Sequence, residues 1–194
     1  MQASRPVQIV LLRHGLPMID RDRRVNATDF GVWVSEYDAV GIDARHRPPQ
    51  AAIEQARGCA FVVCSSLPRS LESARALGME NIGACEPLFR EMGMPYANWR
   101  FPRLGLAVWS VLFRLMWAVG YSANAEPFKE ARERARACAE RLADLASLHG
   151  TVLLVGHGSL NWFIARYLKS MGWKGPRKSP RKHWDFAVYC HQAT

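Results

Sequence analysis

The sequence lacks the features that mark secreted, disulfide-stabilised or zinc-binding proteins. No C-x-x-C pair occurs among its five cysteines, which are Cys59, Cys64, Cys85, Cys138 and Cys190. This spacing predicts neither a zinc ribbon nor a dithiol redox site. The apolar stretch near the N-terminus is too short for a secretory signal, and no small-residue cleavage site follows it. We therefore expect reduced, mostly buried thiols in a cytoplasmic protein.

Internal repeats, linkers and low-complexity blocks are also missing, and acidic residues are fewer than basic ones. A chain of 194 residues suits one domain with one sizeable core. The 26 basic and 17 acidic residues give a formal net charge of +9. This balance predicts an anionic substrate or partner, without specifying the anion.

A clean membrane-spanning segment is absent as well. Residues 103–121 are apolar on nearly every side, and their length approaches the roughly 20 residues that cross a bilayer. Arg114 lies near the middle, where an arginine costs about 2.5 to 3.5 kcal/mol on insertion scales. Gly105 and Gly120 weaken a long helix further. We expect no span, and predict a helix buried in the core, in a homodimer contact or in a substrate cap.

The rest of the chain alternates strands and helices, which predicts an α/β fold. Strands are expected at 7–12, 59–66, 82–85, 151–156 and 184–190. Their continuous apolar runs suit strands covered on both faces. Helices are expected at 48–58, 67–78, 126–150 and 159–172. The second of these begins after Ser66, which is a favourable N-cap residue.

Reactive or cationic side chains follow the three strongest strands. In chain order they are Arg13 and His14, Ser65 and Ser66 with Arg69 one turn later, and His157 between two glycines. The carboxyl ends of parallel strands share one edge of a sheet, where ligands usually bind. Arg69 is informative because a helix N-terminus favours negative charge, so a cation there suggests that an anion is bound beside it.

This set of side chains suits phosphoryl transfer. Guanidinium groups match the oxygens of a phosphate and stay charged. Nearby cations disfavour imidazolium, and a neutral imidazole has a lone pair that can attack phosphorus. A second histidine can donate a hydrogen bond to a non-bridging oxygen. Glu86 and Glu91 are both candidates for the acid that protonates the leaving alcohol.

Four separated motifs, "LLRHG", "SSLPRSLESA", "FRE" and "LLVGHG", together resemble the histidine phosphatase superfamily of the branch 1, phosphoglycerate mutase-like type. The resemblance implies a three-layer α/β/α sandwich with a mostly parallel central sheet, and a phosphohistidine intermediate that needs no metal or other cofactor. Carried over by position, it makes His14 the nucleophile, Arg13 and Arg69 phosphate-binding residues, and His157 the second pocket histidine. Glu91 becomes the general acid and base.

The sequence also departs from the family pattern. Members commonly have a run "RHGET..N", where this chain has Leu16, Pro17 and Asp20. The substrates of the best-known members are therefore not carried over. We expect one domain over 1–194 with an apolar helical cap or insert at about 94–122. Its aromatic residues Trp99, Phe101, Trp109 and Trp117 are candidates for covering an apolar or aromatic leaving group, although core or dimer packing is the commoner role for any one of them.

Other candidate sites are weaker. His46, His149, His183 and His191 have no metal-ligand spacing, so they are interpreted as surface or packing residues and no metal site is predicted. The serines lack the G-x-S-x-G pattern of serine hydrolases. The basic segment 168–184 is interpreted as a solvated loop, or a rim that steers anionic substrate, rather than a nucleic-acid site.

The sequence thus predicts a metal-independent phosphatase that hydrolyses a small phosphomonoester through phosphohistidine. Two alternatives stay open. One is a mutase or phosphotransferase that uses the same pocket. The other is a catalytically silent protein that binds a phosphorylated ligand or nucleic acid.

Overall fold

A five-stranded sheet forms the centre of the protein. The computed structural model describes residues 7–177, 179 and 181–191. The strands are β1 (Val7–Arg13), β3 (Phe61–Ser65), β4 (Ala84–Glu86), β6 (Thr151–Gly156) and β7 (Phe186–His191), in the spatial order β4-β3-β6-β1-β7. Only β7 runs antiparallel to its neighbour. The predicted mostly parallel sheet is confirmed.

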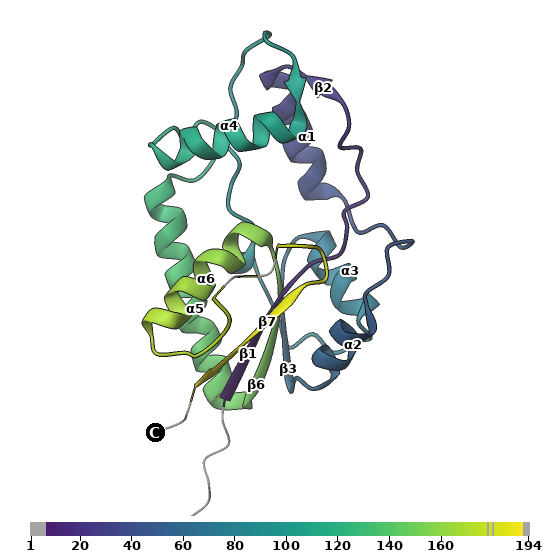
Figure 1. Cartoon of the computed structure of the whole chain (residues 1–194), viewed down its shortest axis with the longest axis vertical. Helices are drawn as coiled ribbons and strands as arrows, with labels where there is room; N and C mark the ends of the chain where they lie inside the picture. The colour runs from purple at the N-terminus through teal and green to yellow at the C-terminus, as the bar shows by residue number, and fades with distance from the viewer. Residues whose placement is uncertain (1–6, 178, 180, 192–194) are drawn as a thin grey trace, which may run out of the picture.

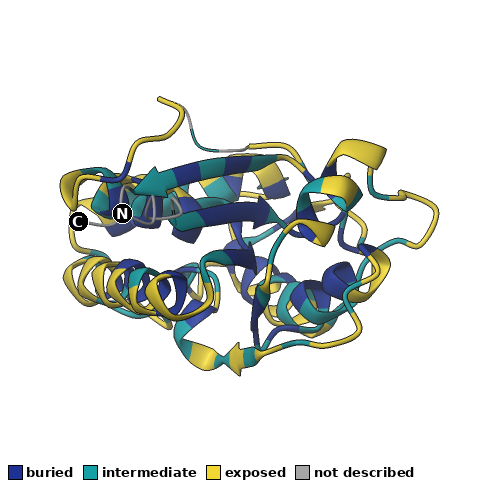
Figure 2. Cartoon of the chain, turned by 90° about the horizontal axis from the view of Figure 1, so that it is seen from below, coloured by how far each residue is buried: buried dark blue, intermediate teal, exposed yellow. Residues whose placement is uncertain are grey.

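Helices cover both faces of this sheet (Figure 1). One face carries α5 (Phe128–His149) and α6 (Gly158–Ser170), and the other carries α2 (Gln50–Arg57) and α3 (Pro68–Ala76). Alternate residues of β1 serve the two layers, because successive side chains of a strand point to opposite faces. Ile9 and Leu11 pack toward α5 and α6, whereas Val10 and Leu12 pack toward α2 and α3. Figure 2 shows buried strands between helices whose outer sides are exposed. The predicted three-layer sandwich is confirmed.

A third group of elements lies beyond the carboxyl ends of the parallel strands (Figure 1). It contains α1 (Ala27–Ala39), α4 (Leu106–Ala118), and a small antiparallel pair, β2 (Arg24–Val25) with β5 (Leu104–Gly105). These elements share an apolar core that includes Phe30, Trp109 and Phe113. A single 3-10 turn, η1 (Pro87–Phe89), follows β4. The apolar segment 103–121 therefore does form a helix.

The sequence analysis missed α1. A local signal was present, because the Asn26 side chain caps the helix by accepting a hydrogen bond from the Asp29 amide at 2.8 Å. The predicted cap of α3 was wrong. Leu67, not Ser66, stands at the N-cap, and Pro68 opens the helix without a side-chain cap.

The structure also tests the expectations for the cysteines and for a membrane-spanning helix. All five cysteines are unpaired, but only Cys64 and Cys138 are buried, and Cys85 is exposed on the edge strand β4. The expectation of mostly buried thiols was therefore wrong. Within the described residues, no helix combines the length and the apolar character that crossing a membrane requires.

Candidate active site

Three adjacent strands bring the sequence motifs together. Arg13 ends β1, Ser65 ends β3, and His157 directly follows β6, which lies between the other two. The register pairs Arg13 with Gly156 across β1 and β6. The rings of His14 and His157 consequently lie with their centroids 5.0 Å apart. Both side chains are buried.

The orientation of His14 leaves one ring nitrogen free. Its Nδ1 lies 2.7 Å from the Gly15 carbonyl oxygen. A carbonyl oxygen only accepts, so Nδ1 carries the hydrogen and Nε2 carries the lone pair. Burial, followed by the proximity of His157 and Arg69, holds the pKa of His14 well below 6.5. The imidazole is therefore neutral near pH 7, as a nitrogen nucleophile must be.

In His157 it is Nε2, not Nδ1, that has a hydrogen-bond partner. Its Nε2 lies 2.7 Å from the Ser65 hydroxyl oxygen, which itself accepts from the Leu67 amide at 3.3 Å. The Ser65 hydroxyl has one hydrogen, and among the described residues its acceptor is Nε2 of His157, so the hydrogen of the neutral ring is on Nδ1. That buried Nδ1 has no partner among the described residues. Burial, then Arg69 and Arg13, hold the pKa of His157 well below 6.5.

Two arginines complete the polar set. Arg69 is fully buried, and its terminal nitrogens donate to the Tyr37 carbonyl at 2.7 Å and the Asp38 carboxylate at 3.0 Å. Its guanidinium also lies over the Tyr37 ring, 4.5 Å from the centroid. Arg13 donates through Nη1 to the Arg181 carbonyl. The anion that the sequence predicted beside Arg69 at the start of α3 is thus, at least in part, the Asp38 carboxylate.

Three buried nitrogens around His14 have no hydrogen-bond partner among the described residues: Arg13 Nε, Arg69 Nε and His157 Nδ1. All three are hydrogen-bond donors. Unpaired buried donors are rare in proteins, because each costs about 1 to 3 kcal/mol in lost solvation. An anion with several oxygens would satisfy such donors.

Two glycines of the sequence motifs leave room for neighbouring side chains that pack at the site. A Cβ atom on Gly15 would lie 2.3 Å from Cζ2 of Trp184, whose indole covers this position. A Cβ on Gly158 would lie 3.3 Å from Nε of Arg13. Each glycine therefore makes room for a specific neighbour, which explains why it flanks a pocket histidine.

His183 also belongs to the site, although the sequence analysis interpreted it as a surface or packing residue. Its Nδ1 donates to the His14 carbonyl at 3.0 Å, and the two rings lie 5.3 Å apart. Burial, then Arg13, lower the pKa of His183 to about 4. Its loop is held against β1 by a hydrogen bond from the Trp184 amide to the Arg13 carbonyl at 3.0 Å. No residue spacing signals this loop contact.

The two candidate acids, Glu91 and Glu86, lie in different surroundings. The Oε1 atom of Glu91 accepts from the amides of Met92 (2.9 Å) and Leu160 (3.0 Å), and Oε2 accepts from the Ser159 amide (3.2 Å). Glu91 thus lies at the N-terminus of α6 beside His157. Glu86 instead pairs with Arg141 of α5 at 3.0 Å.

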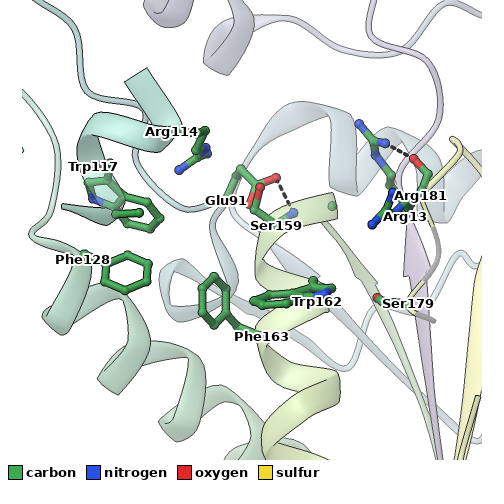
Figure 3. A pocket seen from close by; sticks show the side chains of 12 residues that line it. Arg13, Glu91, Arg114, Trp117, Phe128, Ser159, Trp162, Phe163, Ser179 and Arg181 are labelled. Carbon is green, nitrogen blue, oxygen red and sulfur yellow. Dashed lines mark hydrogen bonds between the residues drawn. The ribbon is translucent and has the colours of Figure 1, made fainter. Parts of the chain in front are cut away.

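Two cavities, each of about 600 Å³, open beside Arg13 and Glu91. Both are lined by Arg13, Glu91, Arg114 and Ser159, so they meet at the site. The first continues along four aromatic side chains, Trp117, Phe128, Trp162 and Phe163 (Figure 3). The second includes Arg69 and continues between α1 and α4, along Trp33, Val34, Met94, Leu106 and Val111. Glu86 lines neither cavity.

Of the four aromatic residues that were candidates for a substrate cap, Trp117 lines the first cavity and the other three lie elsewhere. Trp109 is fully buried between α1 and α4, where its indole N–H donates to the Val25 carbonyl at 2.8 Å. Phe101 is 81% exposed and Trp99 is 43% exposed. None of the three lines either cavity, and Trp109 instead fits the alternative of core packing. The indole side chains that do line the cavities come from Trp33, Trp117 and Trp162.

Two further predictions can be placed in the structure. Asp20, at the position of the family's asparagine, is exposed, and its carboxylate accepts from the Asp22 amide at 2.9 Å. Among residues 7–177, 179 and 181–191, no group of three or more His, Cys, Asp or Glu side chains is arranged to hold a metal ion. The basic segment 168–184 lies partly outside the described residues, but its Arg181 lines the first cavity.

Comparisons with known proteins agree with this geometry. The model of the Histidine phosphatase superfamily (branch 1) matches residues 9–188. No curated protein sequence matches the chain. A solved structure of an open reading frame from Mycobacterium tuberculosis has a TM-score of 0.59 and 15% identity, with 97% of this chain and 96% of that chain covered.

Two solved phosphatases have the same fold. The mycobacterial glucosyl-3-phosphoglycerate phosphatase in complex with VO3 has a TM-score of 0.60 and 19% identity, and the match covers 94% of this chain and 92% of that one. The alpha-ribazole phosphatase from Shigella flexneri has a TM-score of 0.57 and 18% identity, over 93% and 89% of the two chains.

Proposed function

The chain belongs to branch 1 of the histidine phosphatase superfamily, and on this basis we propose that it hydrolyses phosphomonoesters through a phosphohistidine formed on His14. The observation that carries the proposal is the set of three unpartnered buried donors around the neutral His14 ring. A phosphoryl group at this point would receive hydrogen bonds from Arg13, Arg69 and His157. These donors stabilise the charge that develops on its oxygens in the transition state.

In the first step, Nε2 of His14 forms a bond to phosphorus as the bond from phosphorus to the alcohol oxygen breaks. Protonated Glu91 gives its proton to the departing oxygen. Oε2 is the atom proposed to carry this proton, because it accepts one backbone hydrogen bond whereas Oε1 accepts two. The products are the free alcohol and phosphorylated His14.

In the second step, a water molecule attacks the phosphohistidine. The Glu91 carboxylate takes a proton from this water as the new bond from phosphorus to oxygen forms. The bond from phosphorus to Nε2 breaks, inorganic phosphate leaves, and His14 returns to its neutral state. The guanidinium groups supply the positive charge that some phosphatases obtain from a metal, which supports a metal-independent reaction.

The cavity between α1 and α4 supports a small substrate with an apolar leaving group. Its walls beyond the arginines are mostly apolar side chains, such as Trp33, Leu106 and Val111. A wall of this kind suits an apolar alcohol better than a second phosphate, which favours hydrolysis over a mutase reaction. The apolar segment at about 94–122, which contains α4, acts in this proposal as a cap. The five unpaired thiols support a cytoplasmic location.

Release of alcohol from a soluble aryl phosphate tests this proposal. We expect turnover in the presence of a metal chelator, and a loss of at least about 10³-fold in kcat/KM for His14→Ala. The matched control is His149→Ala, which removes a histidine that stacks on Phe61 at the far end of α5. Wild-type activity in His14→Ala would overturn the proposal, as would complete dependence on an added metal.

A further inference from the structure

The outer face of α4 is apolar along its whole length. The buried side of this helix carries Leu106, Trp109, Phe113 and Trp117. Its exposed residues are also all apolar: Ala107, Val108, Val111, Leu115 and Ala118. The exposed fractions are 54% for Val108, 62% for Val111 and 64% for Leu115, and Val119 continues the face at 86%. A surface helix of a globular protein normally places polar residues on its outer side. This face therefore fits an apolar partner.

The exposed charges in this part of the sequence are positive. Residues 92–125 contain no aspartate or glutamate, and their exposed arginines are Arg100 and Arg103, whereas Arg114 donates to the Met92 and Gly93 carbonyls at the cavities. Residues 98–103, which lead into β5 and α4, are all exposed. Arg100 and Arg103 flank Phe101, which is 81% exposed, and Arg100 follows Trp99, which is 43% exposed and packs against Trp109 and Phe113. Aromatic rings next to cationic side chains are typical of protein surfaces that contact lipid headgroups.

From these observations we propose that the outer face of α4, together with residues 98–103, binds the surface of an anionic lipid bilayer. The apolar side chains would enter the boundary between headgroups and acyl chains, and the arginines would contact the anionic headgroups. The helix lies along the surface and does not cross it. Its 13 residues extend about 20 Å at 1.5 Å per residue, whereas the hydrocarbon core is about 30 Å thick.

Charge distinguishes a bilayer from a second copy of the chain. A two-fold contact would bring the same surface of two molecules together. Because Arg100 and Arg103 are exposed and residues 92–125 contain no acidic residue, such a contact would place two positive surfaces opposite each other. An anionic bilayer instead complements the charge and covers the apolar face at the same time.

The docking face is continuous with the second cavity. Val111 and Leu115 belong to the exposed face of α4 and also line this cavity. An amphipathic phosphomonoester in the bilayer could therefore place its phosphate near Arg69 while its apolar part stays along α4. This consequence rests on the proposed phosphatase function, whereas binding of the bilayer does not.

Vesicle flotation tests the docking surface directly. We expect the full chain to float with vesicles that contain phosphatidylglycerol, and more weakly with pure phosphatidylcholine vesicles. The double variant Val108→Glu/Val119→Glu should bind at least about tenfold more weakly. It should keep wild-type activity on a soluble aryl phosphate, because neither residue lines a cavity. Leu148→Glu is the matched control, an exposed apolar residue near the C-terminal end of α5 and outside the proposed docking face.

Two more measurements separate the possible outcomes. Arg100→Gln should weaken binding to the anionic vesicles about fivefold, since each basic residue at such a surface contributes about 1 kcal/mol. His14→Ala should float like the wild type, so loss of catalysis and loss of docking are distinguishable. Absence of flotation at low salt would overturn the proposal. A dimer in light scattering that Val108→Glu/Val119→Glu dissociates would also overturn it, in favour of a second copy.

Discussion

The Ser65 hydroxyl lies 2.7 Å from Nε2 of His157 and determines which nitrogen of that ring faces the pocket. The one hydrogen of this hydroxyl has Nε2 as its acceptor among the described residues, so the ring hydrogen is on Nδ1. A serine at the end of β3 thus orients a histidine after β6. In the proposed mechanism Ser65 is a positioning residue that never contacts the substrate.

Ser65→Ala should lower kcat/KM for an aryl phosphate by roughly threefold to tenfold. This range corresponds to the loss of one hydrogen bond of about 0.5 to 1.5 kcal/mol, while the His157 ring stays in place by packing. The matched control is Ser66→Ala at the next position. Equal rates in the wild type and Ser65→Ala would show that the tautomer of His157 is irrelevant to turnover.

Glu91→Gln should lower kcat by about 10² to 10⁴-fold for an alkyl phosphate, because an amide cannot protonate the leaving alcohol. The loss should be much smaller for nitrophenyl phosphate, whose leaving group needs little protonation. The glutamine keeps one oxygen for the amides of Met92 and Leu160. A comparison of kcat for the two substrates measures the effect.

Glu86→Gln is the control for this experiment. Glu86 pairs with Arg141 and lines neither cavity, so its removal should change kcat less than twofold for both substrates. The assignment of the acid would be wrong if Glu86→Gln, and not Glu91→Gln, showed the dependence on the leaving group.

Gly15→Ala should destabilise the protein by about 1 to 3 kcal/mol, because the new methyl group would overlap the Trp184 ring at 2.3 Å. It should also lower activity, since this ring and His183 share the loop that holds Arg13 and His14. Urea unfolding measures the free energy. The control is Gly58→Ala, where a Cβ meets its nearest atom at 3.5 Å and the backbone φ of −75° accepts alanine.

The buried histidines predict how stability depends on pH. His14, His157 and His183 have pKa values below 6.5 in the folded state, chiefly because of burial. The unfolded chain therefore binds more protons below pH 6.5, and the free energy of unfolding should fall as pH decreases from 7 toward 5. The slope approaches about 1.4 kcal/mol per pH unit for each histidine that stays neutral when folded.

Urea titrations at pH 7, 6 and 5 measure this slope. His183→Asn removes one group whose pKa is about 4 in the folded state, so its slope should be shallower than that of the wild type. Equal slopes in the two proteins would show that His183 titrates in the folded protein as it does in the unfolded chain.

The three inner strands β1, β3 and β6 were predictable because each is a continuous apolar run that ends at or beside a glycine, serine or histidine. The parallel arrangement then places their carboxyl ends together, so the proximity of His14 and His157 could be predicted. The position of Glu91 beside the site was expected from the family resemblance. Its three hydrogen bonds to backbone amides depend on how the chain after η1 passes the start of α6.

The parts that could not be predicted depend on contacts between distant segments. His183 reaches His14 through a loop, and Asp38 reaches Arg69 from the end of α1, a helix with only a weak apolar pattern. Trp109 was predicted to meet a substrate, but it packs against α1 and contacts the Val25 carbonyl. Composition alone does not distinguish an aromatic residue in the core of the α1 and α4 group from one on a cavity wall.

Direct detection of phosphate on His14 tests the central claim most directly. The purified protein would be mixed with an aryl phosphate, quenched within milliseconds under alkaline conditions that preserve phosphohistidine, and mapped by mass spectrometry. The account predicts acid-labile phosphate on His14, formed at least as fast as alcohol is released, and none in His14→Ala. Steady alcohol release with no phosphate on His14, or with phosphate on another residue, would contradict it.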